Sequence, residues 1–155
     1  MTETKSRQYF TADEANRALP LVRVIVADIV ELYATVHERR KRLTHIRQLP
    51  GSRNRDEDSL HGEELAQMDE EVKRDIHRVE EFVDELRKLG VELKDPVIGL
   101  VDFWSKMDGR DVLLCWKLGE DEIAYWHELD AGFGGRQLLM ASSMAGDDET
   151  ADENS

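Results

Sequence analysis

Two long stripes of apolar residues constrain the fold of this chain more than any other feature. The first stripe runs through Val22, Ile25, Ile29, Leu32, Val36, Leu43 and Ile46. The second stripe runs through Leu65, Met68, Val72, Ile76, Val79, Val83 and Leu86. Because the spacings are three or four, apart from one turn skipped at Arg39-Arg40 in the first stripe, each stripe lies on one face of an α-helix. The sequence therefore predicts two long amphipathic helices that pack antiparallel as a hairpin.

The ends of this hairpin carry recognisable signals. Thr11, followed three residues later by Glu14, predicts a capping box and a helix that begins at Ala12. Pro20 lacks an amide proton, so we expect a kink or a new helix there, and we favour a short helix followed by a long one. Gly90 suits the left-handed residue that ends a helix. The hairpin is expected to span about residues 12–89.

Beyond Gly90 the pattern changes to short runs rich in β-branched and aromatic residues. Residues 98–104, 112–118 and 123–128 are expected to form strands, with a short edge strand at 91–93. Asp108-Gly109 is a strong hairpin-turn signal. The predicted fold class is α+β, with a long antiparallel helical hairpin packed with a small C-terminal antiparallel β-sheet, a meander of three to four strands.

The length of 155 residues fits one domain. We expect a single α+β domain over residues 1–141, with the hairpin at about 12–89 and the sheet with a glycine-rich bend at about 91–141. Residues 142–155 contain five acids and no base, which is typical of a disordered acidic tail. Each predicted helix is roughly 40–45 Å long, which exceeds what a small sheet can cover. A homodimer through the long helices is therefore predicted.

The formal net charge of −13 argues against a nucleic-acid partner and against an anionic membrane surface. No apolar run is long enough to span a membrane, and the first residues lack the apolar core of a signal peptide. Cys115 is the single cysteine, so no internal disulfide can form. A cytoplasmic location is expected, with Cys115 as a small core residue rather than a nucleophile.

Polar chemistry is concentrated in residues 126–137, which hold an imidazole, two carboxylates, a guanidinium and three glycines. Glycine permits positive φ and a close approach of the backbone to a ligand. The candidate ligand-binding residues are Trp126, His127, Glu128, Asp130, Gly134, Gly135 and Arg136.

Three interpretations of this bend stay open, and no catalytic residue or cofactor is identified. In the leading one the chain is an interaction or small-ligand-binding module, in which Arg136 grips a small anionic ligand and Asp130 orients Arg136. There His127 and Glu128 supply directional hydrogen bonds or proton transfer. The second is a metal-dependent enzyme with His127, Glu128 and Asp130 as ligands, which needs a bend because neighbouring strand residues project to opposite faces. The third is a purely structural dimer whose polar groups pair within the fold.

Several motifs recur in a pattern that resembles an uncharacterised bacterial family, domain of unknown function 2203. They are Tyr9-Phe10-Thr11, Glu14-Ala15-Asn16, Leu19-Pro20, Glu92-Leu93-Lys94-Asp95-Pro96, Gly99-Leu100-Val101-Asp102-Phe103, Asp108-Gly109-Arg110, Cys115-Trp116-Lys117-Leu118-Gly119-Glu120, Ala124-Tyr125-Trp126-His127-Glu128 and Asp130-Ala131-Gly132-Phe133-Gly134-Gly135-Arg136-Gln137. The resemblance covers about residues 9–138. It supports the single domain and implies no activity for any residue.

Overall fold

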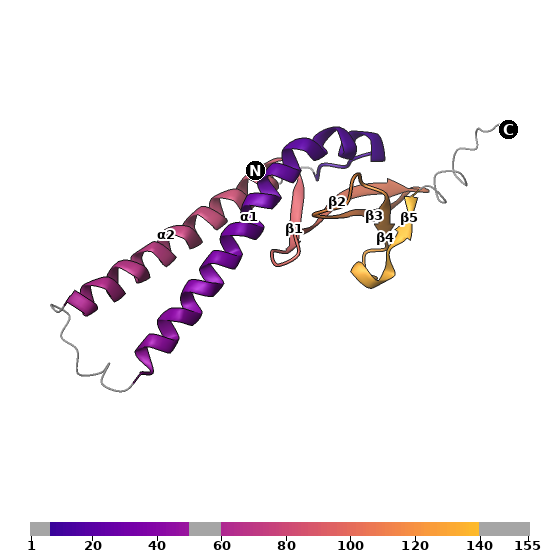
Figure 1. Cartoon of the computed structure of the whole chain (residues 1–155). Helices are drawn as coiled ribbons and strands as arrows, with labels where there is room; N and C mark the ends of the chain where they lie inside the picture. Colours follow the sequence, from indigo (N-terminus) through magenta and orange to yellow (C-terminus); the bar gives the residue numbers. More distant parts are fainter. Residues whose placement is uncertain (1–6, 50–59, 140–155) are drawn as a thin grey trace.

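A helical hairpin and a five-stranded antiparallel sheet make up the fold (Figure 1). The computed structural model describes residues 7–49 and 60–139. The elements are α1 (Ala12–Arg47), α2 (Leu60–Lys88), β1 (Val91–Asp95), β2 (Leu100–Met107), β3 (Arg110–Lys117), β4 (Tyr125–His127), the 3-10 helix η2 (Phe133–Gly135) and β5 (Gln137–Leu138). The strands follow one another in the order β1-β2-β3-β4-β5. The predicted α+β class is confirmed, and the strand count is slightly higher because β5 adds a short strand to β4.

Local sequence signals and packing together determine the structure at the start of α1. Thr11 Oγ1 accepts a hydrogen bond from Glu14 N at 3.0 Å, and Thr11 N donates to Glu14 Oε1 at 2.9 Å, so the capping box is present. The preferred expectation of two helices is wrong, because α1 continues through Pro20. Buried Leu19 and Val22 hold the turns on both sides of the proline. Figure 1 shows the first turns of α1 set at an angle to the rest, as a proline bend requires.

The two apolar stripes face each other where the hairpin extends beyond the sheet. Val36, Leu43 and Val72 are buried there, with Leu65, Met68 and Ile76 packed against them. Arg39 Nη1 pairs with Asp75 Oδ2 at 2.9 Å across the two helices. The stripes thus cover one another without a second chain, and the homodimer stays a prediction. The expected acidic tail at 142–155 lies outside the described residues, as do residues 50–59 between the helices.

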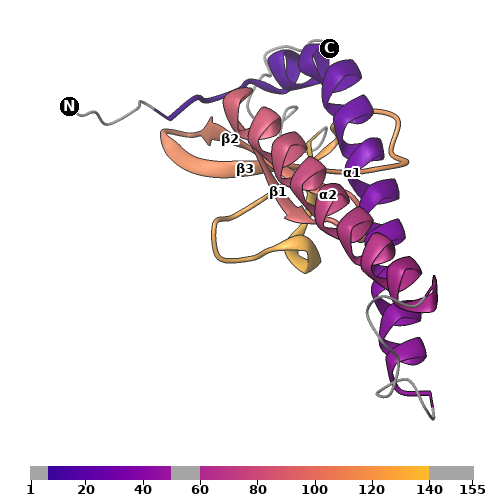
Figure 2. The same cartoon turned by 90° about the vertical axis from the view of Figure 1, so that its left-hand side faces the viewer.

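The helices cover one face of the sheet, here called the inner face (Figure 2). Its buried residues are Val91, Val101, Phe103, Val112, Leu114, Trp116 and Trp126, which join Val22, Val26, Ile29 and Leu86 of the helices in one core. Phe10 meets Phe103 edge to face at a ring separation of 5.2 Å. Each fully buried large apolar side chain stabilises the fold by about 1.5–3 kcal/mol. This core fixes the sheet against one end of the hairpin.

A tight turn sets the register between β2 and β3. Asp108 and Gly109 have φ of 55° and 81°, as the predicted two-residue hairpin turn requires. Met107 therefore pairs with Arg110, and Asp102 pairs with Cys115 five residues further along each strand. Successive side chains alternate between faces. Asp102 and Cys115 consequently lie on the face that points away from the helices, here called the outer face.

Candidate functional site

The outer face of the sheet contains a buried polar cluster of Asp102 in β2, Cys115 in β3 and His127 in β4. Their exposed fractions are 3%, 0% and 3%. A carboxylate oxygen, the thiol sulfur and an imidazole nitrogen of these residues all lie within 4.8 Å of one another. In the described part of the chain, no other group of three such side chains converges in this way. Because buried polar groups cost free energy unless they are paired, this cluster is the leading candidate site.

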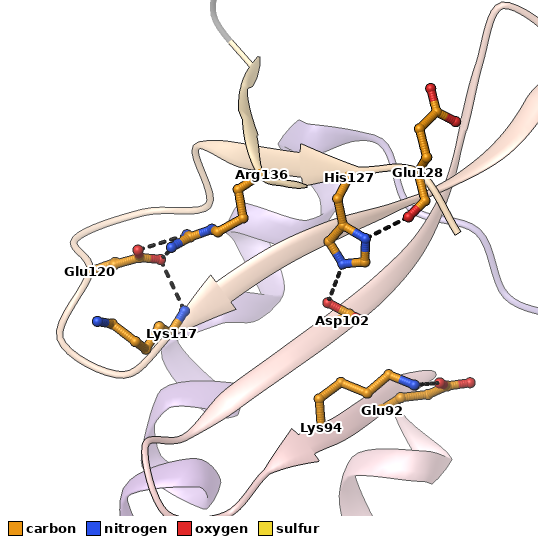
Figure 3. Close-up of polar contacts among 8 residues, drawn as sticks. All are labelled: Glu92, Lys94, Asp102, Lys117, Glu120, His127, Glu128 and Arg136. Carbon is orange, nitrogen blue, oxygen red and sulfur yellow. Dashed lines mark hydrogen bonds and ion pairs between the residues drawn. The ribbon is translucent and has the colours of Figure 1, made fainter. Parts of the chain in front are cut away.

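The orientation of the His127 ring is fixed by the backbone carbonyl of the next residue, Glu128. Nδ1 lies 2.7 Å from the carbonyl oxygen of Glu128, which can only accept, so Nδ1 carries a proton. Nε2 lies 3.3 Å from Asp102 Oδ1 (Figure 3). Two lone pairs facing each other at this distance would repel. Either a proton or a cation must therefore lie between the ring nitrogen and the carboxylate.

Burial perturbs the other two members of the cluster. It raises the pKa of Asp102 above its ordinary value, while the charge of His127 and its hydrogen bond oppose that rise. It also raises the pKa of the Cys115 thiol to about 12, with a smaller contribution from the Asp102 charge. Cys115 is therefore a thiol at neutral pH and a poor nucleophile, which agrees with its prediction as a core residue.

Two ion pairs lie near the cluster, Arg110 with Glu128 and Glu92 with Lys94. Glu128 accepts two hydrogen bonds from Arg110, at 2.6 Å from Nη2 and 3.3 Å from Nε. Glu92, opposite Asp102 in register, accepts from Trp104 Nε1 at 2.9 Å and pairs with Lys94 Nζ at 3.2 Å. The Trp104 hydrogen bond is the main reason that the pKa of Glu92 is lowered. Paired charges thus lie near a cluster whose own side chains are buried.

Arg136 ties the bend after β4 to the turn after β3. Its Nη2 donates to both carboxylate oxygens of Glu120, at 2.8 and 2.7 Å (Figure 3). The guanidinium lies 3.9 Å from the ring centroid of Tyr125 and 4.8 Å from that of Phe133. Glu120 also accepts from the backbone amide of Lys117 at 2.9 Å. Nη2 is thus engaged by a carboxylate and the guanidinium lies beside two rings, while the buried Nε has no hydrogen-bond partner among the described residues.

The structure separates the residues that the sequence placed together. Trp126 is buried in the inner core, whereas His127 belongs to the outer cluster. Glu128 points away from the His127 ring (Figure 3). Asp130 is exposed in a turn and has no hydrogen bond or ion pair with the described residues. His127, Glu128 and Asp130 are therefore not brought together as a ligand set.

The glycine-rich part of the bend forms η2 and the turn before it. A Cβ on Gly135 would lie 2.5 Å from Ala131 Cβ, so this position needs a glycine for close packing. Gly134 has open space around the same position. Arg136 follows directly, and its partner is Glu120 rather than the expected Asp130. The bend therefore acts in this structure as a packed connection.

Sequence reasoning missed the roles of Asp102, Cys115, Arg110 and Glu120. The sequence does hold a signal for Asp102, because it is the one charged residue in the apolar run 98–104. The pairing of Asp102 with Cys115 also follows from the Asp108-Gly109 turn, because the two residues lie five positions from the ends of the turn, at Met107 and Arg110. Arg110 follows that turn directly, but nothing in the sequence indicates Glu128 as its partner.

The chain belongs to the family described as Uncharacterized conserved protein (DUF2203), whose model matches residues 8–139. The match includes all three residues of the outer cluster. No curated protein and no solved structure matches the chain. In residues 7–49 and 60–139, neither helix has an apolar stretch that could cross a membrane. The family description states no activity.

Proposed function

We propose that this member of the family binds one divalent transition-metal ion, with Zn²⁺ as the best fit. The ligands are Asp102 through a carboxylate oxygen, Cys115 through Sγ and His127 through Nε2. The observation that carries the proposal is the convergence of these atoms within 4.8 Å in a buried position. A thiolate, an imidazole and a carboxylate are the three ligand types that zinc takes in proteins.

The surroundings of His127 support this assignment. Histidine ligands usually donate their other ring proton to a carbonyl or carboxylate, which fixes the tautomer. Here Nδ1 donates to the Glu128 carbonyl and leaves Nε2 facing Asp102. Ligand atoms around tetrahedral zinc are about 3.3–3.8 Å apart. The 3.3 Å distance between Nε2 and Asp102 Oδ1 already fits, and the widest separation must shorten by about 1 Å.

Charge balance also favours a divalent ion. With two protons, one between His127 Nε2 and the Asp102 carboxylate and one on the Cys115 thiol, the net charge of the cluster is zero. With a divalent ion, it contains a carboxylate, a neutral imidazole and a thiolate, and its net charge is again zero. One ion thus replaces two protons, which leave to solvent, without adding net charge to the interior.

This ligand set differs from the sequence-based alternative, since Asp102 and Cys115 take the places of Glu128 and Asp130. We assign metal binding and no reaction. A small anionic ligand at Arg136 has less support, because it would have to displace the Glu120 carboxylate. A homodimer stays a prediction that sedimentation can test.

Calorimetric titration of chelator-treated protein with Zn²⁺ tests the proposal. We expect one ion per chain and the release of two protons, counted in buffers of different ionisation enthalpy. Cys115→Ala should weaken binding at least about a hundredfold. The matched control is His77→Ala, which removes an exposed imidazole 3.4 Å from Glu81, itself a potential surface chelate.

Unchanged affinity in His77→Ala is the expected control result. Loss of binding in that variant, or wild-type affinity in Cys115→Ala, would reject the assignment.

A further inference from the structure

A cavity of about 560 Å³ lies where the N-terminal arm meets the end of α2 and the edge strand β1. Arg7, Arg87, Lys88, Gly90, Glu92 and Trp104 contribute to its lining. We propose that it binds the phosphoryl group of a small phosphorylated molecule. Its volume is in the range of small-molecule sites, which is about 300–1,000 Å³. None of its lining residues belongs to the metal cluster, so the two proposals stand independently.

The charges at the cavity favour an anion although the whole chain has a net charge of −13. Arg7, Arg87 and Lys88 are cationic, and Glu92 is the only acidic lining residue in the described part of the chain. The Glu92 carboxylate is already engaged by Trp104 Nε1 at 2.9 Å and Lys94 Nζ at 3.2 Å. The cavity therefore keeps an excess of positive charge. A phosphate monoester, with a charge of about −1.5 to −2 at neutral pH, matches it.

Arg7 is held in place before any ligand binds. Its guanidinium lies 3.7 Å from the ring centroid of Trp104, and its Nη1 is 3.4 Å from Asp111 Oδ2. Phe10 N donates to the Trp104 carbonyl at 2.7 Å and so fixes the arm to the sheet. A planar guanidinium held on an aromatic ring can bind a phosphoryl group through two hydrogen bonds at reduced ordering cost.

Gly90 allows the arm to come this close. Its φ is +89°, and a Cβ there would lie 3.1 Å from Gln8 Oε1 and 3.2 Å from Phe10 Cε1. The same residue turns the chain from α2 into β1. The end of the helix and the arm are thereby brought to one cavity, which combines cations from two distant segments.

Arg87 and Lys88 contribute donors from the last turn of α2. Asp84 is the acid near them, and it lies 3.9 Å from each, beyond hydrogen-bonding distance. Cations at a helix C-terminus also interact favourably with the helix dipole. That role does not account for Arg7 and Trp104 at the same cavity. The combination of a fixed guanidinium and two further cations is the feature that indicates a phosphoryl site.

A titration with inorganic phosphate tests this site, with intrinsic tryptophan fluorescence, to which Trp104 contributes at the cavity, and phosphorus NMR as two readouts. Ionic strength is held constant with NaCl, and acetate is titrated in parallel. We expect saturable phosphate binding, with acetate at least about tenfold weaker because it has one charge and two oxygens. The Arg87→Ala/Lys88→Ala variant should weaken phosphate binding at least about tenfold.

The matched control is Lys73→Ala/Arg74→Ala, which removes a neighbouring cationic pair from the same helix away from the cavity. It changes the net charge by the same amount and should leave phosphate affinity unchanged. All four side chains belong to exposed residues, so circular dichroism should show folded variants. Three results would each overturn the proposal: no saturation in either readout, equal weakening by both variants, or equal affinity for acetate.

Discussion

The two faces of the sheet are built from neighbouring residues of the same strands, yet the buried carboxylate, thiol and imidazole all lie on the outer face. Val101, Phe103, Leu114, Trp116 and Trp126 fill the inner face against the helices. The residues between or beside them, Asp102, Cys115 and His127, are buried almost as completely on the outer face. Apolar burial stabilises the fold, whereas polar burial costs free energy unless a network satisfies every group. The inner face thus builds the core, and the outer face holds the cluster that we propose as the metal site.

The largest effect is expected on the inner face. Phe103→Ala removes a fully buried ring and should lower the free energy of unfolding by about 3–5 kcal/mol. Urea denaturation measures this loss. The folded fraction should still bind one zinc ion, and loss of zinc from folded Phe103→Ala would show that the two faces are not separate in role.

On the outer face, His127→Ala should cost about 3 kcal/mol, because Asp102 would stay buried without its partner. Chemical denaturation of the metal-free protein gives this value. The Asp102→Ala/His127→Ala double variant should cost less than the sum of the two single variants, since it leaves no unpaired charge. Simple additivity would contradict a coupled pair.

Arg136→Ala tests the edge of the outer face, where the pair with Glu120 is partly exposed. We expect a loss of about 2 kcal/mol, because a doubly hydrogen-bonded charge pair is removed. A double-mutant cycle with Glu120→Gln measures the coupling by denaturation. If Arg136 instead served a ligand alone, the cycle would show no coupling between the two side chains.

Cys115→Ala should separate fold from function most clearly. The variant keeps a small apolar side chain, so metal-free stability should fall by less than about 1.5 kcal/mol. Wild-type protein should gain about 2.7 kcal/mol at a free zinc concentration one hundred times its dissociation constant. Thermal unfolding with and without zinc checks both values, and an equal gain in Cys115→Ala would remove the thiol from the site.

The smallest effect concerns Glu92, whose pKa is lowered chiefly by the Trp104 hydrogen bond. A lowered pKa contributes stability that is present above the unfolded value of about 4.5 and is lost as the pH falls through the folded value. Because Glu92 is partly exposed, the stability difference from Glu92→Gln should stay below about 1 kcal/mol. Denaturation of both proteins between neutral and acid pH should show the difference vanish below the folded pKa. A difference that persists there would contradict the assignment.

The parts of the fold that the sequence predicts are those set by local signals. Helical periodicity, the Thr11 cap and the Asp108-Gly109 turn each depend on residues close together in the chain. The effect of Pro20 was harder to predict, because distant residues that pack around the proline decide whether the helix kinks or ends there. Asn16, for example, accepts a hydrogen bond at 2.7 Å from Ile123 N, across the molecule.

The candidate site was only partly predictable for the same reason. The turn fixes Asp102 opposite Cys115, but β3 and β4 are joined by residues 118–124 without a two-residue turn. The register that brings His127 beside Asp102 therefore follows from tertiary contacts. One of them is the hydrogen bond at 2.9 Å that Arg23 Nη2 in α1 donates to the Asp121 carbonyl. Glu120 and Arg136 meet through the same connection, with no pattern in the sequence to indicate it.

A cobalt titration tests the central claim most directly, because Co²⁺ takes tetrahedral zinc sites and its absorption reports a bound thiolate. We expect saturation at one equivalent of Co²⁺ per chain, with a thiolate-to-cobalt charge-transfer band. The band should be present in wild type and His77→Ala and absent in Cys115→Ala. Cobalt binding without that band in wild type, or an unchanged band in Cys115→Ala, would contradict a metal centre at Asp102, Cys115 and His127.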